Sequence, residues 1–535
     1  MAKLSDRPLV FANGPILTQD PSLPLAQGVA VRGTRIAFVG SAVDAIAAAG
    51  PGAKIVDLGG RPPLPGFIDD HTHFVWGGEH LLGIDLRLCG SVGEFRDAIG
   101  RIAALRKKEW ILGGTWNQEQ WNEKRLPRRQ DIDGVTPETP VFVQRLDGHM
   151  GLANTVALRI AGITASTPDP EGGLIEKDHR TGEPTGIVKD TAMRILDAVI
   201  PKLPPAKMDE AVRTAMGEAR RKGITSIHDI TQAEDLASFR RLEKSGELTV
   251  RIYTRLPISG VKEMIAGGIR AGSGTPFLKV GSLKAFADGS LGSNTAWFFD
   301  PYLNDPSSTG LPIDIVTNGQ LRSWALEADR HGLQLSIHAI GDRANDTILS
   351  LFDEIRRINP RWDRRFRIEH AQHVRPADIE RFAQLGVFVS AQPYHLVDDG
   401  PWALSRLGAG RLDGTYAFRS FLERGVRVGF GSDWTVAPLD VVAGIHAAVT
   451  RQTSDGKNPE GWIPEQKLTV EEAIRCYTAH NAYGAFEEQE KGMISRGLLA
   501  DFVLLDRDPR RLPPDELRSV QVDMTVCDGK IIYER

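Results

Sequence analysis

The chain has 535 residues, a formal net charge of −4 and 25% charged residues, which is ordinary for globular proteins. This length exceeds one compact core, so we expect two or more domains. The charge balance lacks the strongly basic footprint of nucleic-acid binders, and no apolar run could span a bilayer. The three cysteines are far apart and no secretory signal segment opens the chain. We therefore expect a cytoplasmic protein that binds a small molecule, with homo-oligomerisation left open.

Both ends of the chain predict short β-strands. Residues 8–60 hold β-rich runs separated by Gly, Asn and Pro turns, with an Ala-rich helix candidate at 42–49. Residues 500–506, 520–526 and 531–533 have the same character. Each segment alone is too small to bury a core, so we predict one β-sandwich domain built from residues 1–63 and 494–535. Two independent β extensions are the less favoured alternative.

Between these ends, β-rich runs alternate with helical patterns, as in parallel α/β proteins. After the opening strand near residues 64–73, strands are predicted at 141–145, 224–228, 279–286, 334–338, 366–370, 387–391 and 426–430. Helices are predicted at 208–221, 319–330, 345–358, 376–384 and 416–424. Eight strands with intervening helices predict an α/β fold of the (β/α)8 TIM barrel type over residues 64–493.

One interval of this barrel is too long. About 210 residues separate His73 from Lys284, where three βα units would need roughly 90. We therefore predict an insertion within about residues 80–220 that caps one mouth of the barrel. Its tryptophans, Trp110, Trp116 and Trp121, and Trp76 just before it, fit core packing and an aromatic pocket wall equally well.

The opening strand ends in His71-Thr72-His73. Residues i and i+2 of a strand point to the same face, so both imidazoles can reach one ion at about 2.0–2.1 Å. Taken alone, such a pair is more often a surface or turn feature. The ends of later predicted strands add further polar residues, which are Lys284, His338, His370 and Asp433. Because barrel enzymes place their active sites at this edge, the six residues together favour a functional site.

Several motifs carry a resemblance to a known family. They lie at residues 65–73, 284–293, 337–342, 368–372 and 431–434, with Asp147-Gly148-His149 in the inserted region. The chain resembles the amidohydrolase superfamily of metal-dependent hydrolases, and within it the amidohydrolase-3 branch that includes N-substituted formamide deformylases. The resemblance implies a TIM barrel with a small β-sandwich.

The resemblance also implies ligand roles. His71, His73 and Asp433 match the ligands of one divalent metal, His338 and His370 match those of a second, and Lys284 matches a carboxylated lysine that bridges both. An ammonium cannot bind a cation, whereas a carbamate formed from CO2 supplies an anionic oxygen. One or two zinc ions are expected, and manganese or iron would suit the same ligands.

The implied chemistry is hydrolysis by a water whose pKa the metal lowers toward about 7. Asp433 would accept the proton of this water and pass it to the leaving nitrogen. His149 is a candidate donor to the substrate, with a structural role equally open. His228 and Asp229 are candidates either for facing the substrate or for supporting the ligands from behind. Asp288 is a further candidate for facing the substrate, and it is expected to shape the loop after the lysine strand.

These features predict hydrolysis of a C–N bond in a small non-peptide amide, formamide or cyclic amide. One alternative is a deaminase of a small ring compound on the same scaffold. Another is a non-catalytic relative that serves as a binding protein. The six filled ligand positions favour an enzyme, because a binding protein would be free to lose them.

Overall fold

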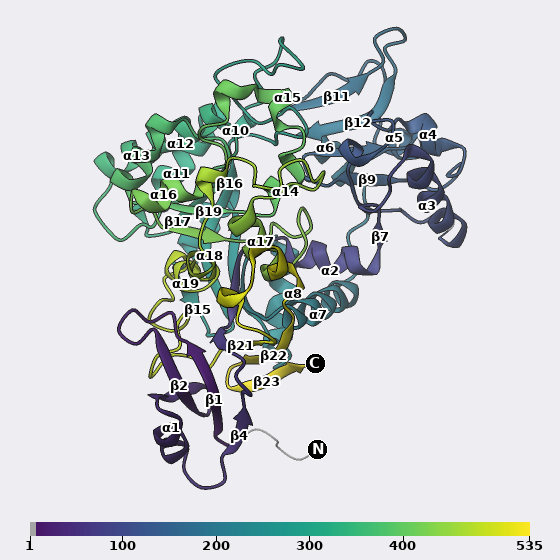
Figure 1. Ribbon diagram of the computed structural model, residues 1–535. Coiled ribbons are helices and arrows are strands. Elements are labelled where there is room, and N and C mark those ends of the chain that lie inside the picture. Colours follow the sequence, from purple (N-terminus) through teal and green to yellow (C-terminus); the bar gives the residue numbers. More distant parts are fainter. Residues whose placement is uncertain (1–6, 107) are drawn as a thin grey trace.

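A computed structural model describes residues 7–106 and 108–535 (Figure 1). A barrel lies in the middle of the molecule. The strands at both chain ends lie below it, and a separate sheet lies at its side (Figure 1). Within the described residues, no helix combines the length and apolar character needed to cross a membrane.

The barrel consists of eight parallel strands that pair in chain order. They are β6 (Phe67–Thr72), β13 (Ile224–Ile230), β14 (Arg251–Pro257), β16 (Leu278–Phe286), β17 (Gln334–Ala339), β18 (Arg367–His370), β19 (Phe388–Ala391) and β20 (Val428–Phe430). The short β15 (Ser273–Gly274) pairs antiparallel with β16. A parallel bridge between Thr72 and Trp434 brings the first strand to the last. The predicted TIM barrel is confirmed.

Helices connect these strands. The larger ones are α2 (Phe74–Leu82), α7 (Pro205–Arg221), α8 (Ala233–Lys244), α11 (Gln320–Arg330), α12 (Asp342–Ile358), α13 (Pro376–Leu385) and α17 (Val441–Thr450). Shorter ones are α9 (Val261–Ala266), α10 (Asp314–Thr317), α14 (His395–Asp399), α15 (Ala403–Leu407), α16 (Phe418–Glu423), α18 (Val470–Cys476) and α19 (Ala479–Gly484). The five helices predicted in this region all form, with ends shifted by a few residues, as expected for helix boundaries.

The seam between β6 and β20 is held by side chains as well as by backbone. The Asn481 amide donates to the carbonyls of Ile68 at 2.6 Å and Phe430 at 2.8 Å. The Asp433 N–H donates to the His71 carbonyl at 2.7 Å. At Gly431 a Cβ would lie 2.5 Å from the His71 nitrogen, so only glycine allows this approach. The seam therefore fixes His71 and Asp433 beside each other.

One strand assignment was wrong. The predicted strand at 141–145 is β9 (Phe142–Arg145) of the inserted sheet, and the barrel strand that the sequence did not reveal is β14. Strand β14 carries Arg251 and Arg255, and both are fully buried. Arg251 pairs with Asp501 at 2.8 Å, and Arg255 pairs with Glu369. Two charged residues in a core strand hide the apolar pattern by which buried strands are recognised.

The insertion forms a six-stranded sheet between residues 84 and 190, inside the predicted interval. Its strands, in spatial order, are β11 (Gly173–Lys177), β12 (Pro184–Asp190), β10 (Met150–Ala153), β9, β8 (Gly113–Trp116) and β7 (Ile84–Asp85). The helices α3 (Val92–Leu105), α4 (Arg129–Asp133), α5 (Thr155–Ile160) and α6 (Met193–Asp197) accompany it. Trp116 and Trp121 are buried in its core, whereas Trp76 lines a cavity at the barrel mouth.

Two small sheets, built from the two ends of the chain, lie below the barrel in Figure 1. One contains β3 (Arg35–Gly40), β2 (Leu25–Arg32), β1 (Leu9–Leu17) and β4 (Lys54–Asp57), and α1 (Ala42–Ala49) packs on it. The other contains β23 (Lys530–Glu534), β22 (Val522–Cys527), β21 (Phe502–Leu505) and β5 (Pro63–Pro65). Phe11 and Phe502 contact each other in a core that both sheets share, with ring centroids 5.3 Å apart. The boundaries at residues 63 and 494 stay predictions.

Candidate metal centre

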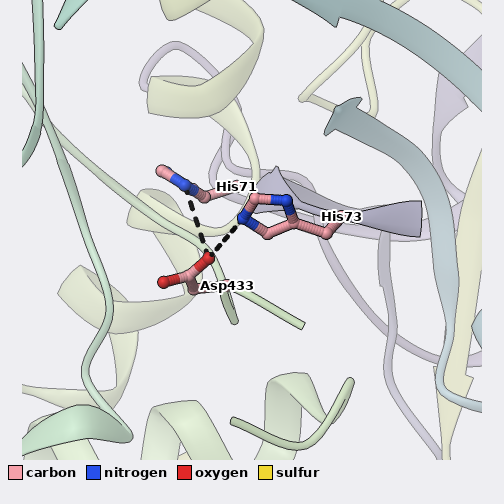
Figure 2. A group of neighbouring side chains, drawn as sticks. All are labelled: His71, His73 and Asp433. Carbon is pink, nitrogen blue, oxygen red and sulfur yellow. Dashed lines mark ion pairs between the residues drawn. The ribbon is translucent and has the colours of Figure 1, made fainter. Parts of the chain in front are cut away.

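Three predicted ligands meet where β6 and β20 end (Figure 2). Oδ1 of Asp433 lies 3.2 Å from Nε2 of His73 and 3.5 Å from Nε2 of His71. Two ligands about 2.0–2.1 Å from one zinc ion in tetrahedral geometry lie roughly 3.3 Å apart. The three side chains therefore have the spacing of an ion site before any rearrangement.

Further histidines adjoin this group. His370 ends β18, and its ring centroid lies 4.8 Å from that of His71 and 4.4 Å from that of His338. His395 was not predicted, although it follows β19 by four residues and so lies at the same edge of the barrel. Its Nε2 is 3.8 Å from Oδ2 of Asp433. The structure thus brings together five predicted ligands and one histidine that was not predicted, His395. The five are His71, His73, His338, His370 and Asp433.

Buried polar atoms without partners test whether this group fits a cation. Four such atoms belong to the centre and have no hydrogen-bond partner among the described residues: Nζ of Lys284, Nδ1 of His370, Nε2 of His395 and Oδ1 of Asp433. A buried polar atom without a partner costs about 1–3 kcal/mol. Imidazole and carboxylate ligands suit zinc, manganese and iron. The residues present therefore fit a divalent metal.

Lys284 lies on β16 with its side chain buried. Its Nζ lies 4.6 Å from the centre of the Phe286 ring. Burial lowers the pKa of Lys284 to about 7. A substantial part of this amine is therefore uncharged at neutral pH, which is the form that reacts with CO2. Its carboxylation stays a prediction.

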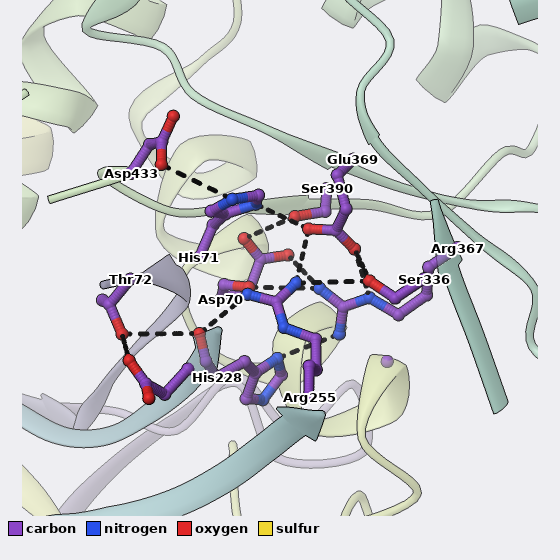
Figure 3. A network of polar contacts seen from close by, with 12 residues as sticks. Asp70, His71, Thr72, His228, Arg255, Ser336, Arg367, Glu369, Ser390 and Asp433 are labelled. Atoms are coloured by element: carbon purple, nitrogen blue, oxygen red, sulfur yellow. Dashed lines mark hydrogen bonds and ion pairs between the residues drawn. The ribbon is translucent and has the colours of Figure 1, made fainter. Parts of the chain in front are cut away.

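Glu369 lies behind His71 and is fully buried (Figure 3). Its carboxylate lies 2.6 Å from Nδ1 of His71. Burial lowers the pKa of His71 to about 3, so the neutral ring donates its Nδ1 proton to Glu369 and keeps the Nε2 lone pair toward Asp433. Arg255 and Arg367 hold the pKa of Glu369 well below its usual value despite burial. Glu369 was not predicted as a site residue, although it stands beside His370 in the 368–372 motif.

His228 belongs to this same network (Figure 3). Its Nδ1 lies 3.0 Å from Nη1 of Arg367, and its carbonyl accepts from Arg255 at 2.8 Å. Arg367 also donates to the Asp70 carbonyl at 3.1 Å. His228 is completely buried, so its contacts are with the residues that support His71.

Asp229 and Asp288 both accept hydrogen bonds from backbone N–H groups. Asp229 accepts from the Phe74 N–H at 2.7 Å, and burial raises the pKa of its carboxyl to about 7. Asp288 accepts from the N–H groups of Ile340 at 3.0 Å and Gly341 at 2.8 Å, which fixes the loop after β17. In the described part of the chain, neither residue lines the two cavities at the centre, and their role toward a substrate stays a prediction.

A cavity of about 310 Å³ opens over the ligands. A narrower pocket of about 50 Å³ adjoins it and shares His149 with it. His149 lies in the turn between β9 and β10, where Asp147 also accepts from the Ser293 hydroxyl at 2.9 Å and so ties the inserted sheet to the barrel. Burial alone would lower the pKa of His149, but a contact of 2.6 Å with Asp190 raises it.

Two of the ligand candidates have strained backbones. His370 has φ 72° and Asp433 has φ 56°, both in the left-handed region. This conformation costs a residue with a side chain roughly 1–2 kcal/mol. Such strain persists where the surrounding structure enforces it, and it is concentrated at functional sites.

Comparison with protein families decides the relationship. The model of the amidohydrolase family matches residues 54–533. The chain belongs to the amidohydrolase family. It is 36% identical to the protein LONG AFTER FAR-RED 3 of Arabidopsis thaliana, over 98% of this chain and 91% of that protein. It is 29% identical to N-substituted formamide deformylase of Arthrobacter pascens, over 99% of both proteins.

A solved structure is similar along nearly the whole length. It is an uncharacterized metal-dependent hydrolase from Pyrococcus horikoshii, with a TM-score of 0.76 and 26% identity. The likeness covers 95% of this chain and 99% of that one. The amidohydrolase assignment and the overall architecture are therefore independently supported by sequence and by structure.

Proposed function

We propose that this chain is a metal-dependent hydrolase that cleaves a C–N bond in a small amide, formamide or cyclic amide. The observation that carries the proposal is the convergence of His71, His73 and Asp433 below a cavity, with ligand atoms 3.2 and 3.5 Å apart. The deformylase relative supports hydrolysis of a C–N bond rather than another bond.

The proposed metal ligands are His71, His73, Lys284, His338, His370 and Asp433. A divalent ion held by these residues would lower the pKa of a bound water and polarise the substrate carbonyl. Lys284 contributes to ion binding only as a carbamate, because its ammonium form would repel the ion. His338 has its Nε2 3.0 Å from the Gly289 carbonyl, which leaves Nδ1 as its ligand atom.

Two residues would move protons. Asp433 accepts the proton of the attacking water. It then delivers this proton to the leaving nitrogen. His149 donates to the substrate oxygen, since Asp190 at its Nδ1 directs the other ring nitrogen away from that carboxylate. The cavity of about 310 Å³, together with an adjoining one of about 690 Å³ that shares His149 and Phe286 with it, has the size of a small-molecule site.

Two measurements test the proposal. The purified protein is analysed for bound metal, and it is then assayed with formamides, N-acyl amines and cyclic amides in the presence of zinc and bicarbonate. We expect bound metal and turnover of at least one amide class. Release of ammonia from an aromatic ring compound, without amide hydrolysis, would replace the proposal with the deaminase alternative. A folded, metal-free protein that gains no activity with added metal would instead indicate a binding protein.

A further inference from the structure

The loop after β19 contributes a histidine that the proposed ligand set does not use. His395 begins α14, and its Nε2 is buried without a hydrogen-bond partner among the described residues. It faces Oδ2 of Asp433 at 3.8 Å, which is too long for a hydrogen bond. A buried imidazole nitrogen that faces a carboxylate oxygen at this distance has a spacing that suits two ligands of one cation.

The two oxygens of Asp433 face different partners. Oδ1 faces His71 and His73, whereas Oδ2 faces His395. The ligand atoms of His370, His395 and Asp433 lie within 4.8 Å of one another. Two ligands at about 2.0–2.1 Å from one ion can lie up to about 4.2 Å apart, so the gap of 3.8 Å between His395 and Asp433 can hold an ion. The rings of His370 and His395 are nearly parallel, with an interplanar angle of 18°.

We infer that His395 is a ligand of a second divalent cation, which it holds together with His370 and Oδ2 of Asp433. Asp433 then bridges two cation positions, one through each oxygen. This inference rests on the proposed metal dependence and adds one ligand to the second ion. His395 would then be the ligand that follows β19, a strand that supplies no other proposed ligand.

The test counts metal ions per chain. Wild type, His395→Ala and His395→Gln are loaded with zinc, passed through a desalting column and analysed by mass spectrometry for bound metal. We expect two ions in wild type and one in both variants. His331→Gln serves as the control, because His331 is exposed at the end of α11 and its loss should leave two ions bound.

A second readout keeps the inference falsifiable if one variant folds poorly. Cobalt replaces zinc, and titration of the apoprotein followed by visible absorption should show two saturating steps in wild type and one in the His395 variants that retain a wild-type circular dichroism spectrum. Two ions retained in either folded variant, or a single ion in wild type, would overturn the inference. A wild type that binds no metal would instead refute the proposed metal-dependent function.

Discussion

Replacing Glu369 with glutamine tests the support behind the metal centre. The substitution keeps the shape of the side chain and removes its charge. Oε2 of Glu369 lies 2.6 Å from Nδ1 of His71 and also accepts from Arg255, and Oε1 accepts from Arg367 at 2.9 Å. Without it, Arg367 keeps the nearby Asp70, whose carboxylate lies 3.5 Å away.

The magnitude follows from the burial of the network, since Glu369, Arg255 and Arg367 are each 0% exposed. Removing one partner of a buried ion pair costs about 3–5 kcal/mol of the free energy of unfolding. Loss of a residue that orients a metal-binding histidine lowers metal affinity by roughly 10–100-fold. We therefore expect Glu369→Gln to be destabilised by several kcal/mol and to bind zinc more weakly.

Urea unfolding of the metal-free protein measures the first effect, and competition with a chelator measures the second. Glu354→Gln is the matched control. Glu354 also pairs with an arginine, Arg322, but their side chains are 29% and 57% exposed. Exposed pairs contribute about 0–1 kcal/mol. If Glu369→Gln unfolds at the urea concentration of wild type and retains its zinc affinity, the role assigned to this network is wrong.

Three further predictions concern single residues of the centre. Asp433→Asn should retain the fold and lose about 10²–10⁴-fold in kcat, measured on any identified substrate, and a near-wild-type rate would remove Asp433 from proton transfer. Lys284→Ala should hold less metal by mass spectrometry, whereas Lys279→Ala on the same strand should hold as much as wild type; equal metal in both variants would contradict the carbamate role. The pKa of His149 is raised by Asp190 despite burial, so the stabilisation from this pair is fully present below about pH 6.5 and is lost as pH rises through the raised pKa. The excess stability of wild type over His149→Gln should therefore be larger near pH 6 than near pH 9 in urea unfolding, and a pH-independent difference would count against the pair.

The sequence predicted the barrel because short β-rich runs alternate with segments of helical spacing along its length. Strand β14 escaped recognition because Arg251 and Arg255 are neutralised by acids that lie far away in the sequence, Asp501 and Glu369. No local pattern records such a pairing. Conversely, the strand at 142–145 has the right composition but belongs to the inserted sheet, a distinction that only tertiary pairing makes.

The six ligands could be proposed from the sequence because the ends of parallel strands in a barrel meet at one edge. His395 was missed because it lies four residues beyond its strand, inside a helix, where a histidine carries no spacing signal. His228 follows the same strand-end rule as the ligands, yet it contacts Arg367 and Arg255 within the network behind His71. The position of a residue along its strand thus predicts which edge of the barrel it occupies. The direction of its side chain depends on partners that lie far away in the sequence.

The core shared by the two chain ends has a consequence for synthesis on the ribosome. Phe11 and Val29 pack in one cluster with Phe502 and Val526, so the inner face of the first sheet has no cover until the last strands appear. About 440 residues separate these segments, and at roughly 5–20 residues per second their translation takes about 20–90 s. During that time the first strands present an apolar face to the cell, and the barrel has time to fold first. The first sheet is therefore synthesised before the barrel and completed after it.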